Sequence, residues 1–148
     1  MTPDQFLSQI ERQEPAPAYL FLGPEPYRRM LCRRALAAGF LSGEDPDQAL
    51  ASFDLQETSL NAVLDDASSL SLFAPKRLVW ASNAEAALPR GVAADPPALL
   101  ADYVKRPAPG VVLVLDVTRY DMEGEDKTKL ERVRKFYSAV PAEVEFPR

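Results

Sequence analysis

The stretch Val111–Leu115, which reads Val-Val-Leu-Val-Leu, decides the fold class of this 148-residue sequence. An unbroken run of β-branched and leucine side chains predicts a strand that is covered on both faces, as in a parallel sheet packed between helices. Ala18–Leu22 and Arg77–Ala81 are predicted strands of similar apolar character. A weaker strand is predicted at Ser52–Leu55, and a last one at Glu143–Phe146.

Helical patterns alternate with these strands. Apolar residues recur at helical spacing within residues 6–10, 27–36, 60–70, 98–103 and 130–137. The first helix begins at Thr2-Pro3-Asp4-Gln5, which supplies an N-cap, a first-turn proline and a capping-box partner, and it is expected to end near Gln13. Thr58 or Ser59 can cap the third helix. The alternation predicts a three-layer α/β fold with a mostly parallel sheet of about five strands, Rossmann-like or P-loop-like.

Composition limits the class of protein. The sequence is 47% hydrophobic and 26% charged, which is typical of a packed globular chain and, at 148 residues, of a single domain. No apolar run approaches the roughly 18 residues that cross a bilayer, so we expect no membrane partner. The amino terminus lacks the basic and apolar regions of a secretory signal, and we expect a cytoplasmic protein.

Several kinds of chemistry are excluded by residue counts. The sequence has one cysteine, Cys32, and no histidine, so an internal disulfide, the usual zinc sites and Ser-His-Asp catalysis are absent. The net charge of −5 argues against a strong nucleic-acid footprint. Basic residues do gather between Lys127 and Lys135, and we interpret them as a solvated helix face, with contact to DNA left open.

The turn Gly23-Pro24-Glu25-Pro26 follows the first strand and leads into a helix, which is where α/β proteins hold phosphate. A working phosphate loop needs several backbone N–H donors, a lysine and a magnesium-binding hydroxyl. Here two prolines remove donors and Glu25 would repel phosphate. We therefore interpret the turn as a degenerate phosphate loop that binds no nucleotide, and we expect no cofactor.

Other reactive residue types are better explained structurally. Asp116 ends the central strand as a metal-holding acid would, but no second acid follows it. Asp65 and Asp66 are adjacent on a helix and point about 100° apart, so they do not form a catalytic pair. Cys32 has arginine neighbours but no base partner, which favours a passive thiol.

The segment Ser71-Leu72-Phe73 departs from the surrounding pattern. Two large apolar residues fall in the predicted turn between the third helix and the strand at Arg77, directly before Ala74-Pro75. In one reading they fold back as a lid on the core. In the other they are anchors that insert into an apolar pocket of a partner, stiffened by the proline behind them.

A family resemblance rests on the order of several segments. In chain order these are Tyr19–Gly23, Asn61–Leu70, Ser71–Phe73, Arg77–Val79, Leu100–Val104, Pro107 and Val111–Leu115. With them the sequence resembles, over essentially its whole length, the amino-terminal domain of the bacterial DNA polymerase III delta subunit.

The resemblance implies an AAA+-like clamp-loader fold with a degenerate phosphate loop, in a subunit that opens the sliding clamp without hydrolysing ATP. The family's clamp-binding Ser-Leu-Phe element corresponds to Ser71, Leu72 and Phe73 in this sequence. Implied partners are the sliding clamp (the beta subunit), the other clamp-loader subunits in a full-length protein, and DNA only indirectly or weakly. The lid and collar domains of the family pattern are not in the sequence.

Three hypotheses therefore follow from the sequence. The first is a non-catalytic, clamp-binding domain of residues 1–148, within a family that belongs to the polymerase III holoenzyme. The second is a nucleotide-binding enzyme of the P-loop class, and the third is a structural α/β module with another protein partner. In a parallel sheet a helix-to-strand loop lies opposite a strand-to-helix turn, so we expect Leu72 and Phe73 at the far end of the domain from Gly23.

Overall fold

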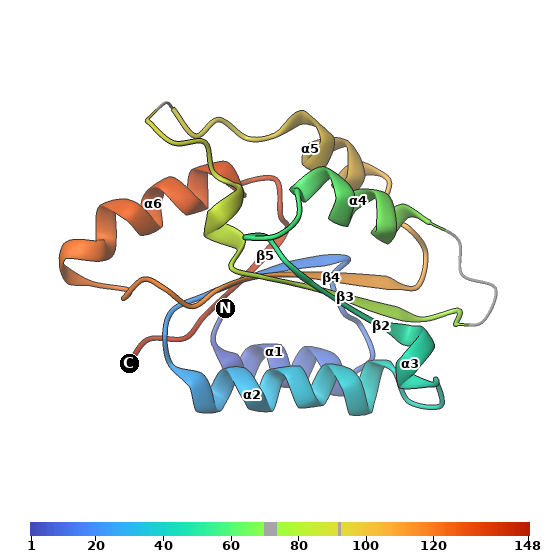
Figure 1. Ribbon diagram of the computed structural model, residues 1–148. Coiled ribbons are helices and arrows are strands. Elements are labelled where there is room, and N and C mark those ends of the chain that lie inside the picture. The colour runs from blue at the N-terminus through green and yellow to red at the C-terminus, as the bar shows by residue number, and fades with distance from the viewer. Residues whose placement is uncertain (70–73, 92) are drawn as a thin grey trace.

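A single parallel sheet organises the chain (Figure 1). The computed structural model describes residues 1–69, 74–91 and 93–148. Within these residues the sheet has five strands in the order β2-β3-β4-β1-β5, and each neighbouring pair is parallel. The strands are β1 (Ala18–Leu22), β2 (Leu50–Asp54), β3 (Arg77–Ser82), β4 (Val111–Val117) and β5 (Ala142–Glu145). The predicted three-layer α/β class is confirmed, and the sheet is wholly rather than mostly parallel.

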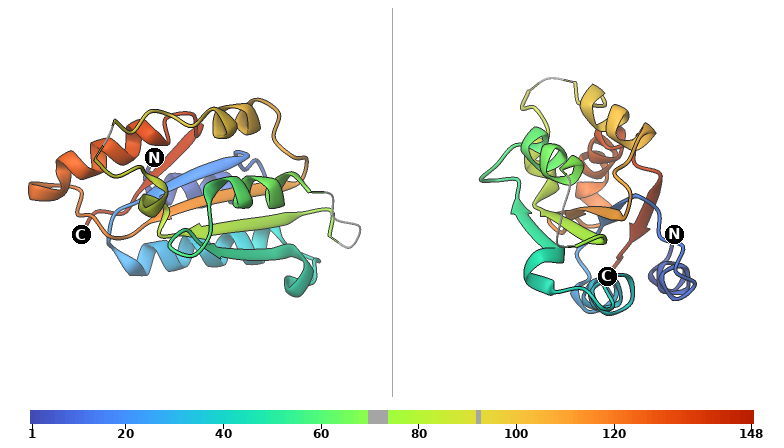
Figure 2. Two further views of the ribbon diagram at one scale, coloured as in Figure 1. Left: turned by 45° about the horizontal axis from the view of Figure 1, so that its top comes forward. Right: turned by 90° about the vertical axis from the view of Figure 1, so that its right-hand side faces the viewer.

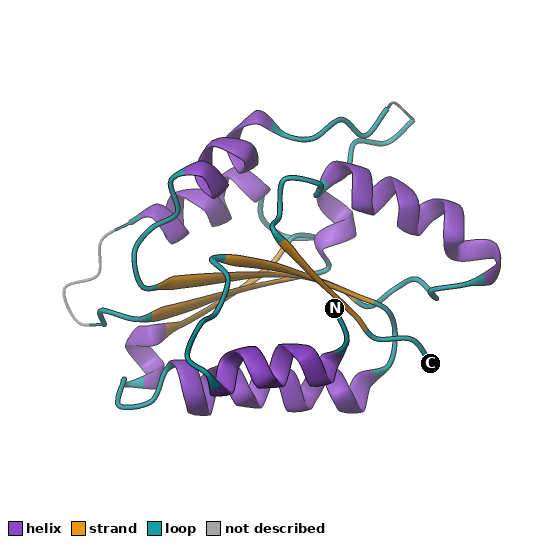
Figure 3. Ribbon diagram, turned by 180° about the vertical axis from the view of Figure 1, so that it is seen from behind, coloured by secondary structure: helices purple, strands orange, loops and turns teal. Residues whose placement is uncertain are grey.

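Helices cover both faces of the sheet. One face carries α1 (Pro3–Glu11), α2 (Pro26–Ala35) and the short α3 (Pro46–Ala49), and the other carries α4 (Leu60–Ser68), α5 (Ala98–Lys105) and α6 (Lys127–Phe136). The two layers are clear end-on in Figure 2 and from behind in Figure 3. A π-turn η1 (Leu36–Phe40) and the 3₁₀ turns η2 (Ala84–Ala87) and η3 (Gly124–Asp126) complete the elements.

Local signals explain most of the element boundaries. Thr2 Oγ1 accepts the Gln5 N–H while Gln5 Oε1 accepts the Thr2 N–H, which confirms the predicted capping box, with Pro3 in the first turn. Ser59, the second of the two proposed caps, accepts the Ala62 N–H at the start of α4. No helix of the described residues is long and apolar enough to span a bilayer.

Some boundaries differ from the sequence prediction. β2 starts at Leu50 rather than Ser52, and it follows directly on α3, a short helix that was not predicted and that begins behind the N-cap Asp45. α1 ends at Glu11 rather than near Gln13, and β4 continues to Val117 rather than Leu115. The continuation buries Asp116 inside the sheet.

Aromatic packing fixes the face of the sheet that α1 and α2 cover. The Phe21 ring on β1 meets three other rings at centroid distances of 5.0–5.4 Å, those of Phe6, Trp80 and Phe146. All four side chains are almost fully buried. Edge-to-face and tilted aromatic pairs of this kind add about 0.5–1.5 kcal/mol each beyond their burial. Phe21 thus joins α1, β3 and the chain beyond β5 at one point.

Removing this ring should be costly. We expect Phe21→Ala to lower the free energy of unfolding by about 3–5 kcal/mol, because it leaves a cavity that the neighbouring rings cannot fill. Urea denaturation measures the loss. Leu99→Ala is the control, because Leu99 is 52% exposed on α5. A loss below about 1 kcal/mol for Phe21→Ala would show that the site collapses and that this cluster does not organise the core.

Candidate functional site

The turn between β1 and α2 is tied into the sheet by backbone hydrogen bonds. Gly23 has a φ of +117°, and its N–H donates to the Val117 carbonyl at 3.1 Å. The Glu25 N–H donates to the Phe146 carbonyl, also at 3.1 Å. A β-carbon at Gly23 would clash with that same carbonyl, so glycine is required by both space and backbone conformation. The chain beyond β5 therefore closes over the turn.

The Glu25 carboxylate caps the start of α2. Its carboxylate oxygens accept the N–H groups of Tyr27 at 2.9 Å and Arg28 at 2.8 Å. Pro24 and Pro26 have no N–H to offer. The free donors and the positive end of the helix dipole, which hold phosphate in working loops, are thus engaged by the protein's own carboxylate.

Arg29 occupies the crevice behind the turn. Its Nε donates to Asp116 Oδ1 at 2.8 Å, and its terminal nitrogens donate to the carbonyls of Gly23, Glu25 and Val117. Both side chains of the ion pair are more than 90% buried. The guanidinium also lies 4.6 Å from the centroid of the Phe146 ring. One side chain thus joins α2, the turn, β4 and the chain beyond β5.

The pair determines the chemistry of Asp116. Burial raises the pKa of the Asp116 carboxyl, and the Arg29 guanidinium beside it opposes that rise. The carboxylate is engaged by an arginine, and the described residues contain no cluster of three or more side chains that could hold a metal ion. The Arg29 guanidinium therefore neutralises the buried Asp116 carboxylate and fills the space behind the β1–α2 turn.

The connection from α4 to β3 lies at the amino-terminal ends of the strands, opposite the end at which β1 leads into α2. Arg77 starts β3 and reaches back to the end of α4, with Nη2 at 2.7 Å from Asp66 Oδ2 and Nη1 at 3.0 Å from the Asp66 carbonyl. The Ser69 hydroxyl donates to the same carbonyl at 2.7 Å. Arg77 is 9% exposed. These contacts stabilise both described ends of the connection.

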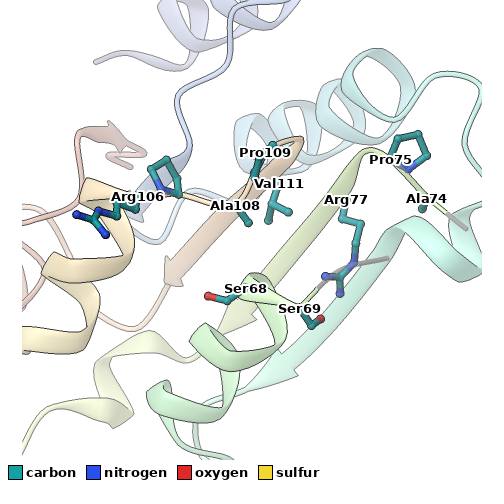
Figure 4. Close-up of a pocket in the computed structure, with 10 residues that line it drawn as sticks. Ser68, Ser69, Ala74, Pro75, Arg77, Arg106, Ala108, Pro109 and Val111 are labelled. Carbon is teal, nitrogen blue, oxygen red and sulfur yellow. The ribbon is translucent and has the colours of Figure 1, made fainter. Parts of the chain in front are cut away.

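The start of β3 also contacts the residue that precedes β4. The Arg77 N–H donates to the Gly110 carbonyl at 2.8 Å, and Gly110 has a φ of +73°. A β-carbon at Gly110 would clash with the Pro75 carbonyl, so only glycine permits this approach. A cavity of about 280 Å³ lies beside these contacts, and Figure 4 shows Arg77 reaching across it toward Ser69.

Comparisons with known proteins identify the family. The model of the family described as DNA polymerase III, delta subunit matches residues 19–140. The chain belongs to the DNA polymerase III delta subunit family. Among solved structures it is similar to the Bacillus subtilis DNA clamp loader delta protein (YqeN), with a TM-score of 0.73 and 22% identity over 98% of this chain. No curated protein matches the sequence.

The chain is short relative to that structure. The alignment covers 42% of the Bacillus subtilis protein, so the chain corresponds to less than half of its length. At 22% identity the likeness shows a shared fold, which is the AAA+-like clamp-loader fold that the sequence resemblance implied.

The predicted site residues of this delta-family chain have different outcomes. Ser71, Leu72 and Phe73 lie outside the described residues, so their role stays a prediction. The described chain on either side of them adjoins the end of α4 and the start of β3, and Figure 1 shows this end of the sheet opposite the end where β1 leads into α2. The turn of Gly23, Pro24, Glu25 and Pro26 lies where a phosphate loop would, and its failure to bind nucleotide also stays a prediction.

The other candidate residues are explained by their surroundings. Burial raises the pKa of the Cys32 thiol to about 12, so the sulfur is protonated at neutral pH and is not a nucleophile. Asp65 is exposed, whereas Asp66 is half-buried and paired with Arg77. Asp66 therefore has a structural role that its position on a polar helix face did not indicate.

The basic helix α6 is largely internally compensated. Arg134 forms ion pairs with Glu131, Glu143 and Glu145 at 2.7–3.4 Å. Lys129 and Lys135 lie 3.9 and 3.5 Å from aspartate oxygens, those of Asp126 and Asp95. Most of the basic residues of α6 thus pair with nearby carboxylates, as expected on a solvated helix face.

Arg29 is the functional-site residue that sequence reasoning missed, and its removal gives a direct test. We expect Arg29→Met to lower the free energy of unfolding by about 3–5 kcal/mol, because it leaves the Asp116 carboxyl buried without its cation. The double variant Arg29→Met/Asp116→Leu should recover much of that loss. Denaturant unfolding of the singles and the double forms a mutant cycle. Arg28→Met, at an exposed neighbour, should have little effect, and an equal loss there would contradict the account.

Proposed function

We propose that this chain is a non-catalytic domain of a clamp-loader delta subunit that binds the sliding clamp, the beta subunit, and helps to open it during DNA replication. Ser71, Leu72 and Phe73 form the clamp-binding element in this proposal. The observation that carries it is the position of the element in a delta-family chain. In the sequence it falls in the connection from α4 to β3, and Arg77 holds the two described ends of that connection in place.

Rigid flanks favour binding through a short apolar element. Ordering a flexible segment on binding costs free energy, and a segment whose two ends are already fixed loses less of it. Here the end of α4 is held by the Arg77 and Ser69 bonds to Asp66, and the start of β3 by its approach to Gly110. The leucine and phenylalanine are thus presented from a preorganised base.

The apolar pair needs additional contacts. Burying a leucine and a phenylalanine contributes about 1.5–3 kcal/mol each, or roughly 3–6 kcal/mol for the two. Micromolar binding requires about 8 kcal/mol. Lys76 is exposed next to Pro75, with its ammonium 5.9 Å from the Phe40 ring centroid, and in this proposal it contributes at the rim, whereas Arg77 is engaged with Asp66 and is a positioning residue. Clamp opening follows if the bound surface fits an opened clamp better than a closed one.

We also propose that residues 1–148 form one AAA+-like amino-terminal domain, with lid and collar domains lying outside this chain. The 98% and 42% coverages of the chain and of the Bacillus subtilis protein support this division. In a full-length protein the other clamp-loader subunits are then further partners. DNA is contacted indirectly or weakly, in keeping with the paired charges on α6.

Binding to the clamp tests the proposal directly. We expect calorimetry to detect binding of this chain to its cognate sliding clamp, and Leu72→Ala/Phe73→Ala to abolish it, because both apolar anchors are removed. The thermal melt of the double variant should match that of the parent. Leu99→Ala, which trims another exposed leucine on α5, should bind normally.

Two results would reject the site. The first is unchanged affinity in the double variant. The second is a large drop of the melting temperature in both Leu72→Ala and Phe73→Ala, which would mean that the pair folds back as a lid on the core.

A separate experiment tests the alternative hypothesis of a P-loop enzyme. Because the Glu25 carboxylate accepts the N–H groups at the start of α2 and Arg29 pairs with Asp116, ATP should not bind at the β1–α2 turn, so any change of the thermal melt in millimolar ATP with Mg²⁺ should be the same in the parent and in Glu25→Ala. Differential scanning fluorimetry measures this. A concentration-dependent rise of the melting temperature that Glu25→Ala strengthens would favour the enzyme hypothesis instead.

A further inference from the structure

A second cavity lies at the carboxyl edge of the sheet. It has a volume of about 490 Å³ and is separate from the β1–α2 turn and from the α4–β3 connection. Its lining comes from segments that follow β2, β3 and β4 and from α6. Ligands of open α/β sheets bind outside the carboxyl ends of the strands, so the position itself is typical of a binding site. Figure 1 shows α6 and the segment after β3 on the same side of the sheet.

Three arginines converge on this cavity from separate segments. Arg90 follows η2, Arg119 follows β4, and Arg132 lies on α6. Arg132 donates to the Pro89 carbonyl, which holds α6 against the segment that carries Arg90. Arg90 and Arg119 are exposed, and neither forms an ion pair with any residue that the structure describes.

One carboxylate faces these arginines. Glu85 lines the cavity, and its Oε1 is buried with no hydrogen-bond partner among the described residues. Burial raises the pKa of the Glu85 carboxyl, and Arg119 opposes the rise. The nearby carboxylates of Asp54 and Asp116 already accept bonds from other residues of the protein. The cavity therefore combines a net positive lining with a single buried acceptor that lacks a donor.

An aromatic ring completes the set of groups. Tyr120 is half-buried at the rim, with the Arg119 guanidinium and the Lys129 ammonium each 5.8 Å from its ring centroid. Bases stack on such rings, and the strength of the stacking depends little on the identity of the base.

We propose that this cavity binds a nucleotide unit. Arg90 and Arg119 hold the phosphate, for which planar guanidinium groups are well suited, and Glu85 accepts an N–H of the base while the base lies beside Tyr120. The cavity volume lies within the roughly 300–1,000 Å³ usual for small-molecule sites. A simple carboxylate would leave Glu85 Oε1 without a donor, and inorganic phosphate would make no use of the Tyr120 ring, which is why we favour a nucleotide. The proposal does not depend on clamp binding.

Calorimetry at low ionic strength tests this site with three probes: inorganic phosphate, deoxyadenosine monophosphate and a short single-stranded oligodeoxyadenylate. We expect binding of at least one of the nucleotide probes, at least tenfold tighter than that of phosphate. Arg90→Ala and Arg119→Ala should each weaken it roughly tenfold, because each removes charge-assisted hydrogen bonds to the phosphate. Glu85→Ala should reduce the preference for the nucleotide over phosphate.

Arg12→Ala is the matched control. Arg12 is exposed at the end of α1 on the other face of the sheet, so its loss removes the same charge without touching the cavity. Arg119→Lys keeps the charge but not the planar donor group and should bind severalfold more weakly than the parent. If the oligonucleotide binds more tightly than the mononucleotide, the ligand is a nucleic-acid strand. If the mononucleotide binds more tightly, the ligand is a free nucleotide.

Three outcomes would overturn the proposal. They are the absence of binding by all three probes at millimolar concentration, an equal loss of affinity in Arg12→Ala, and phosphate binding as tight as that of the mononucleotide.

Discussion

The buried contact between Arg29 and Asp116 is the constraint on which the rest of this structure depends. It links α2 to β4 across 87 residues of sequence, and the same guanidinium closes the turn at Gly23. A buried ion pair adds little net stability compared with apolar packing, but the loss of either partner alone is costly. Its effect here is to fill the crevice in which related folds hold phosphate, and so to make that end of the domain a fixed part of the scaffold.

The two ends of the sheet differ in what occupies them. Nucleotide-dependent folds use the carboxyl end of β1 for chemistry, whereas in this chain Glu25, Arg29 and the chain beyond β5 occupy it. The opposite end carries the α4–β3 connection on flanks held by Arg77 and Gly110. In the function proposed above, a domain of the delta subunit family built in this way presents a binding element rather than turning over a substrate.

Local sequence patterns predicted the layers of the fold but not its side-chain convergence. The run at Val111–Leu115 marks a strand because a fully buried strand needs no polar alternation. The Asp45 cap before Pro46 is a local signal for α3, and the helix was not predicted because its four residues are too few to show helical periodicity. No local sequence pattern predicted the Arg29–Asp116 pair or the cavity that Arg90 and Arg119 both line. Each depends on which strands are neighbours in the sheet.

Hydrogen exchange with and without the cognate sliding clamp tests the central claim most directly, because it reports which end of the sheet meets the clamp. The account predicts slower exchange of backbone amides between residues 68 and 77 in the complex, with exchange at residues 23–30 unchanged. Protection at residues 23–30 with none at 68–77 would contradict it, since the clamp would then bind at the closed crevice.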